Sequence, residues 1–86
     1  MNTISLKTVS YIIYLLKSEL PEVYAEQPRH DKTHANPKVD YTNIILEQKL
    51  KGTFYAFSQT LINFIQKQDK ESVRQLLYGL DINNLQ

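Results

Sequence analysis

The 86-residue chain contains no cysteine and only two glycines. Without cysteine, a disulfide scaffold, a thiol nucleophile and a cysteine-ligated zinc site are all excluded. Two glycines are too few for a glycine-rich loop that wraps a phosphate group. The net charge is +1, so the chain also lacks the basic excess that is typical of nucleic-acid-binding domains. These absences favour a domain that carries out no catalytic chemistry.

Long hydrophobic runs are absent as well. The apolar run at 11–16 is far shorter than the roughly 20 residues that span a bilayer, and no signal-peptide cleavage site follows it. We therefore expect a cytoplasmic protein with no membrane segment. Hydrophobic residues make up 42% of the chain and charged residues 22%, which is typical of a folded domain. We expect one domain over residues 1–86.

Apolar residues at steps of three and four predict a helix from about residue 3 or 5 to residue 20. Thr3 or Ser5 is its expected N-cap, because a hydroxyl oxygen accepts from a free backbone N–H. The segment 8–14 is rich in β-branched and aromatic residues, which favours a strand, but it lacks strict alternation. The seam of the predicted helix consists of Leu6, Val9, Ile13, Leu16 and Leu20.

A second, longer helix is predicted from Asp40, its expected N-cap, to about Gln68. Its apolar residues fall on two faces, so we place it at the centre of the domain with neighbours on both sides. Gly52 lies in its middle, which predicts either the close approach of another backbone or a bend. The predicted core includes Leu50, Phe54, Phe57, Leu61 and Phe64.

Two shorter elements complete the prediction. Pro21 ends the first helix, and a short helical turn after it would place Val23 and Tyr24 against the core. Asp69 is the expected N-cap of a third helix, and Gly79 is expected to end that helix in the left-handed conformation. The core stripe of the third helix consists of Val73, Leu76, Leu77 and Leu80.

The connection at about 26–39 is polar and contains two prolines, so it predicts a loop. Two histidines four residues apart suit a metal ion on a helix, but further ligands at a diagnostic spacing are missing. We therefore predict no metal ion and no cofactor. The basic residues of the loop would contact phosphate or an acidic protein surface, or serve as a solvated linker. The candidate loop contacts are Arg29, His30, Lys32, His34 and Lys38.

Together these elements predict an all-α fold, a small antiparallel bundle of two long helices and one short C-terminal helix. The third helix is too short to cover both long helices. We therefore expect that a homodimer or a protein partner completes the bundle. Tyrosine suits such a contact, because its ring is apolar and its hydroxyl reaches water at the rim. The candidate contact residues are Tyr11, Tyr14, Leu15, Tyr55 and Ile62.

The function that these features favour is a non-enzymatic protein–protein interaction module. Small inhibitors, immunity proteins and regulatory adaptors act in this way, by occupying a surface on a larger protein. The alternative is a nucleic-acid-associated regulator that uses the basic loop at 29–38. That alternative predicts retention on heparin with a strong dependence on salt, because phosphate contacts release counterions.

Overall fold

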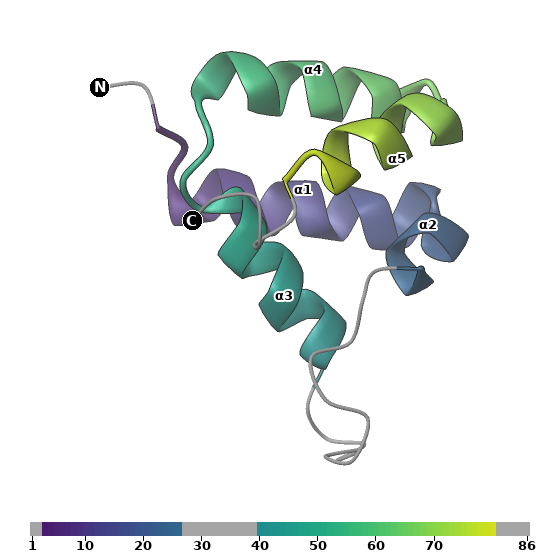
Figure 1. Ribbon diagram of the computed structural model, residues 1–86, viewed down its shortest axis with the longest axis horizontal. Coiled ribbons are helices and arrows are strands. Elements are labelled where there is room, and N and C mark those ends of the chain that lie inside the picture. Colours follow the sequence, from purple (N-terminus) through teal and green to yellow (C-terminus); the bar gives the residue numbers. More distant parts are fainter. Residues whose placement is uncertain (1–2, 27–39, 81–86) are drawn as a thin grey trace.

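The computed structural model describes residues 3–26 and 40–80, which fold into helices joined by short turns (Figure 1). These ranges contain no β-strand, which confirms the all-α prediction. None of the helices in them is long and apolar enough to cross a bilayer. The candidate loop residues at 29–38 lie outside the described ranges. The helices are α1 (Leu6–Glu19), α2 (Pro21–Ala25), α3 (Tyr41–Leu50), α4 (Tyr55–Gln66) and α5 (Lys70–Tyr78).

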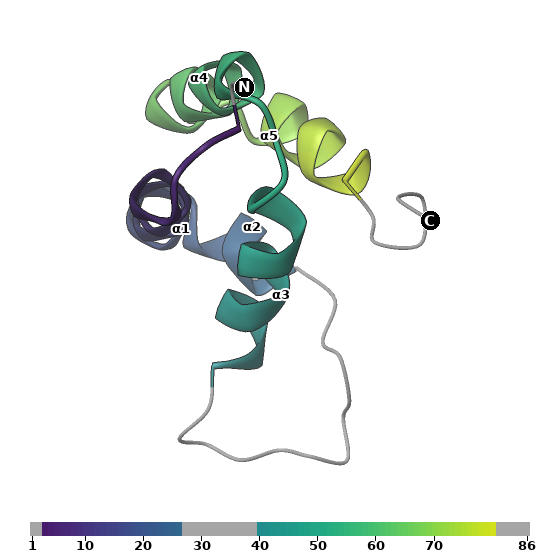
Figure 2. The same ribbon diagram turned by 90° about the vertical axis from the view of Figure 1, so that its left-hand side faces the viewer.

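The helices lie in two layers, with α4 and α5 above α1, α2 and α3 (Figure 2). α1 and α4 lie side by side and run in the same direction. The backbone N–H of Ile4, just before α1, donates to the carbonyl of Thr53, just before α4, at 3.0 Å. At the other end, Gln68 Nε2 donates to Glu19 Oε1 at 3.1 Å. α5 then turns back along α4. α1 and α4 therefore pack as a parallel pair, whereas the sequence predicted an antiparallel bundle.

The predicted single helix from Asp40 to Gln68 is wrong, because the chain breaks between α3 and α4. Thr53 closes the end of α3, with its backbone N–H and its hydroxyl both donating to the carbonyl of Leu50, at 3.0 and 2.8 Å. Gly52 lies in this turn, and a Cβ atom there would meet nothing within 4 Å. Of the two alternatives predicted for Gly52, the close approach of another backbone is therefore wrong, and the chain changes direction there instead.

The break changes the position of one predicted core residue. Phe54 becomes the extended N-cap residue of α4, at φ −87° and ψ 156°, and its side chain is 61% exposed. Its assignment to the core is therefore wrong. Leu50 and Leu61 are fully buried as predicted, whereas Phe57 and Phe64 are half-buried at the edge of the core. The largest fully buried apolar side chains are Ile12, Leu16, Leu20, Leu46, Leu50, Leu61, Ile65 and Leu77.

The predicted caps are largely confirmed. The side chains of Ser5, Asp40 and Asp69 each accept from the backbone N–H three residues further on. α2 forms directly after Pro21, with Val23 buried and Tyr24 packed against the core. The first seam is correct except for Leu6, which is exposed in the first turn of α1.

The left-handed helix end occurs at a different residue from the one predicted. Gly79 has a helical φ of −65°, so that prediction is wrong. Among the described residues, Gln68 is the non-glycine residue with a positive φ, at 58°. The N–H of Asp69 donates to the carbonyl of Phe64, and that of Gln68 to Ile65, which is the Schellman pattern. This turn lets α5 fold back on α4.

Candidate functional site

The two sides of α1 meet different helices. Ser10, Ile13 and Lys17 lie on the side toward α3, where they line a pocket with α3 residues. Tyr11, which is 45% exposed, lies on the opposite side of α1. It forms a row with Leu15 and Glu19, because residues four apart share one face of a helix. The end of this row, Glu19, accepts a hydrogen bond from Gln68 just beyond α4. The side that carries Tyr11 therefore faces α4.

Tyr14 occupies the outward crest of α1, where its side chain is 64% exposed and also lines the pocket toward α3. Leu15 lies in the same row as Tyr11 but is buried against the core. Its position beneath the surface differs from the sequence-based expectation that it contacts a partner.

α4 also presents two different sides. Phe57 lines a groove together with Leu80, just beyond α5, so its side of the helix is the one toward α5. Tyr55 and Ile62 lie on the other side, toward α1. Tyr55 is 58% exposed, and Ile62 is half-buried and packs against the core. A shallow hollow of about 380 Å³ follows this side and the outward crest, lined by Gln59, Thr60, Ile62, Asn63 and Gln66.

The parallel arrangement sets which residues of α1 and α4 lie level with each other. In both end contacts, the partner on the α4 side is 49 positions further along the chain. Because both helices rise by the same distance per residue, Tyr11 lies level with Thr60 and Tyr14 with Asn63. Figure 2 shows α1 and α4 together at one edge of the molecule, with α2, α3 and α5 on the inner side. We call the outer surface the α1–α4 face, defined by Tyr11, Tyr14, Tyr55, Gln59, Ile62 and Asn63.

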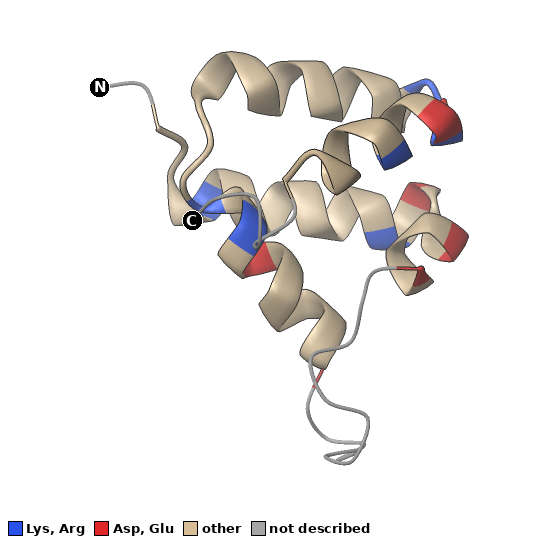
Figure 3. Ribbon diagram, in the orientation of Figure 1, with Lys and Arg blue, Asp and Glu red and all other residues tan. Residues whose placement is uncertain are grey.

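The α4 half of this face contains no charge. The sequence of α4, YAFSQTLINFIQ, has no acidic or basic residue, and Figure 3 shows the whole helix without a charged position. Charged residues flank the face at its two ends, with Lys7 at the start of α1 and Glu19 and Lys67 at the far end. An apolar and amide centre with a charged rim is the composition of a protein interface.

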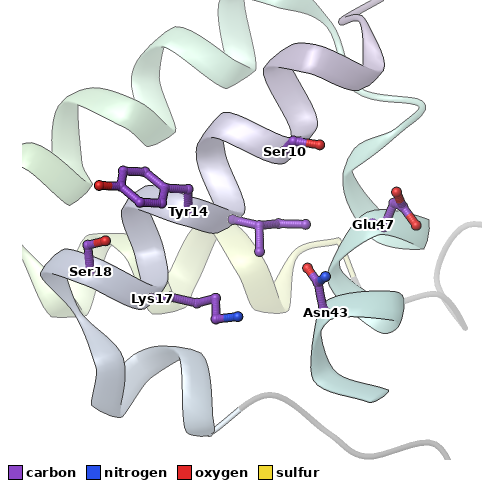
Figure 4. A pocket seen from close by; sticks show the side chains of 7 residues that line it. Ser10, Tyr14, Lys17, Ser18, Asn43 and Glu47 are labelled. Atoms are coloured by element: carbon purple, nitrogen blue, oxygen red, sulfur yellow. The ribbon is translucent and has the colours of Figure 1, made fainter. Parts of the chain in front are cut away.

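The pocket between α1 and α3 has a volume of about 420 Å³ and a mixed lining (Figure 4). Hydroxyl groups come from Ser10, Tyr14 and Ser18, and an acidic group from Glu47. Lys17 also lines it, but its ammonium group pairs with the Asp40 carboxylate at 3.3 Å.

Asp40 joins three helices at the start of α3. One of its oxygens accepts from the backbone N–H of Asn43 at 3.0 Å, and the other from the Tyr24 hydroxyl at 2.6 Å. The Lys17 ammonium also lies 5.3 Å from the centre of the Tyr24 ring. The hydrogen bond from Tyr24 lowers the pKa of Asp40, and burial together with this contact raises the pKa of Tyr24.

Ion pairs connect α2 with α5. Lys70 Nζ lies 2.6 Å from Glu22 Oε2, and the Arg74 guanidinium binds both oxygens of Glu26, at 2.8 and 2.7 Å. These hydrogen bonds lower the pKa of both glutamates. We call this contact the α2–α5 seam, defined by Glu22, Glu26, Lys70 and Arg74. Its charged groups face each other within one molecule, so the seam is a structural contact.

A second hollow, of about 380 Å³, lies where α3 passes into α4. Its lining includes the exposed Phe54, Phe57 and Leu80, together with Lys49 and Lys51. The described residues contain no group of three or more side chains that could hold a metal ion.

Sequence reasoning missed Gln59 and Asn63, although their signal was present as a 12-residue stretch without charge. Comparisons with protein-family models, curated proteins and solved structures found no match.

Proposed function

We propose that the protein is a non-enzymatic protein–protein interaction module, of the kind found among small inhibitors, immunity proteins and regulatory adaptors. It occupies a surface on a larger protein through the α1–α4 face. The observation that supports this proposal is the gathering of three exposed tyrosines and an uncharged helix on one side of a parallel helix pair. Interface centres are enriched in tyrosine and depleted of charged residues.

The construction of the face also supports the proposal. Tyr11 and Tyr14 belong to a 14-residue helix that is fixed on its inner side by fully buried residues such as Ile12 and Leu16. Tyrosine has two side-chain torsions, so fixing it in a contact costs little conformational entropy. A rigid helix pair also presents its side chains at a fixed spacing, which reduces the ordering that binding requires.

Affinity purification from the native host tests the proposal with matched variants. The test variant is Tyr14→Glu with Tyr55→Glu, which adds two charges to the α1–α4 face. The matched control is Tyr78→Glu on α5, because Tyr78 is 54% exposed and lies outside the face. We expect one protein to be recovered with the wild type and the control and to be lost with the double variant. Equal recovery with all three proteins would contradict the proposal.

The alternative, a nucleic-acid-associated regulator, depends on the basic residues at 29–38, which lie outside the described ranges. No contact in the described residues favours it. It remains distinguishable by heparin chromatography. The interaction module is expected to elute at low salt, whereas a phosphate-binding loop would give retention that falls steeply as salt rises.

A further inference from the structure

We propose that the α1–α4 face of the free protein pairs with the same face of a second copy, across a two-fold axis. This inference rests on the proposed function, because it names the partner that covers that face when the larger protein is absent. In a two-fold dimer, one surface patch contacts itself, so its groups must be self-complementary. The chemistry of the α1–α4 face meets this requirement.

Charge is the first part of the argument. A charged residue near the centre of a self-contacting patch lies close to the same charge in the other copy, and like charges there oppose association. Charged residues make up 22% of the chain, yet none occurs in the 12 residues of α4. The charges nearest to α4 are Glu19 and Lys67 at its far end, and on the α1 side Lys17 and Glu47 line a pocket together with Tyr14. The α4 half of the face therefore meets its own copy without repulsion.

Hydrogen-bonding capacity is the second part. The exposed polar groups on α4 include the side-chain amides of Gln59 and Asn63, and the face also carries the hydroxyls of its exposed tyrosines. An amide and a phenol each both donate and accept, so each forms a hydrogen bond with a group of its own kind. A carboxylate only accepts and an ammonium only donates, so neither can do this. Each polar group at the centre thus finds a partner in an identical surface.

The size of the face predicts a weak, reversible dimer. α1 has 14 residues and α4 has 12, so they are about 21 and 18 Å long. Packed helices lie about 8–10 Å apart, and the face is therefore roughly 20 Å in each direction. Such a patch, about 400 Å² per copy, is smaller than the interfaces of stable complexes, so the association is expected to be weak and transient. The second copy and the larger protein use the same face, so they exclude each other.

A charge-swap experiment on the full chain tests the pairing. One double variant carries Gln59→Lys with Asn63→Lys, and the other carries Gln59→Glu with Asn63→Glu. In a dimer of either variant alone, like charges meet whether residue 59 lies opposite 59 or opposite 63. In the mixture of both variants, opposite charges meet in every one of these arrangements. The matched controls are Gln75→Lys and Gln75→Glu, at an exposed position on α5.

The measurement is the sedimentation-equilibrium mass at about 1 µM to about 1 mM protein, the range in which a weak interface associates. We expect the wild type and the controls to approach twice 10.1 kDa at the highest concentration. Each double variant alone should show a dissociation constant raised by about tenfold or more, and the mixture should recover the wild-type mass. Circular dichroism of each variant establishes that it is folded.

Two results would overturn the pairing. The first is a wild-type mass of 10.1 kDa at every concentration. The second is a dimer that both double variants form as well as the wild type, since it would use another surface. The proposed function fails separately, when the double tyrosine variant retains the larger partner. A monomer that binds its partner through Tyr14 and Tyr55 would therefore refute this inference alone.

Discussion

The α1–α4 face and the α2–α5 seam are two helix pairs of one small domain with opposite surface chemistry. At the seam, Glu22 of α2 pairs with Lys70 of α5. Glu26, just beyond α2, pairs with Arg74 of α5. At the face, exposed tyrosines and amides lie over a buried apolar contact, and α4 has no charge at all. The charges of the seam are used within the molecule, whereas the groups of the face point outward.

This difference separates folding from binding. The hydrogen-bonded ion pairs at the seam hold the short helix α2 against α5, and a helix of five residues needs such tertiary contacts. The face contributes to folding through its buried side, such as Leu15, and leaves its exposed side available. Substitutions beneath the face or at the seam should therefore affect stability, and substitutions on the face should affect association.

The largest effect is expected beneath the face. Leu61 is fully buried on the inner side of α4. Leu61→Ala should reduce the free energy of unfolding by about 2–5 kcal/mol, because burial is lost and a cavity is left behind. Because a small domain has only about 5–10 kcal/mol of stability, this change should be plain in urea unfolding. Phe57→Ala is the comparison, and its half-buried ring predicts a smaller loss. A larger loss for Phe57 would contradict this assignment of the core.

The second largest effect is expected at Asp40. Asp40→Ala removes the N-cap of α3 and the contacts with Tyr24 and Lys17, so the free energy of unfolding should fall by about 1–2 kcal/mol. Asp40→Asn keeps a good capping residue without its charge, and should lose less. Chemical denaturation of the two variants compares them directly, and equal losses would show that the cap contributes nothing.

The next effect is a pH dependence that belongs to the seam. The folded-state pKa values of Glu22 and Glu26 lie below the ordinary value for a glutamate, because Lys70 and Arg74 donate hydrogen bonds to them. A lowered folded pKa means that the unfolded chain binds more protons, so stability is present above about pH 5 and is lost as pH falls through the folded pKa values.

Thermal unfolding between about pH 6 and pH 2 measures this loss, since it spans the pKa range of carboxylates in proteins. Glu26→Gln should melt at a lower temperature than the wild type at neutral pH and should lose less stability on acidification. Glu71→Gln is the control, because Glu71 is highly exposed and lies 3.6 Å from Arg74. If Glu26→Gln and Glu71→Gln behaved alike, the bidentate contact of Glu26 would have no role in the pH dependence.

The smallest effect on stability is expected on the face itself. Tyr14→Ser replaces an exposed side chain away from the core, so the free energy of unfolding should change by no more than about 0.5 kcal/mol. The same variant should weaken self-association in sedimentation equilibrium. A large loss of stability without any change in association would place Tyr14 in the core contacts of α1 and break the distinction between the two regions.

Local sequence signals predicted much of the fold. Ser5, Asp40 and Asp69 identified three helix starts, because a capping side chain acts within three residues of its own position. Pro21 likewise identified the boundary between α1 and α2. Each of these features depends on residues that are close together in the chain, so a few consecutive residues of the sequence were enough to predict it.

The break between α3 and α4 lies at Gly52, where the sequence indicated a bend as one alternative, but the apolar periodicity hid the end of the helix. Leu50, Phe54, Phe57 and Leu61 keep a helical spacing across the turn, so the periodicity continues although the helix does not. The bond from the Ile4 N–H to the Thr53 carbonyl joins residues far apart in the chain.

The α1–α4 face was predicted only in part. The exposed tyrosines were recognised as candidate contacts, but the level at which α1 and α4 meet is fixed by contacts at both of their ends. Sequence spacing does not show which side of α1 turns toward α4. Leu15 therefore appeared as a surface candidate, although it lies beneath the face, and the amides of Gln59 and Asn63 did not stand out.

The most direct test of the account is the concentration dependence of the backbone amide resonances, measured residue by residue by NMR. Two-fold pairing through the α1–α4 face predicts that rising concentration shifts the resonances of residues such as Tyr14, Gln59 and Asn63, with those of Glu22 and Lys70 unchanged. Shifts concentrated at the α2–α5 seam, or no shift anywhere at millimolar protein, would contradict the claim that the α1–α4 face is the contact surface.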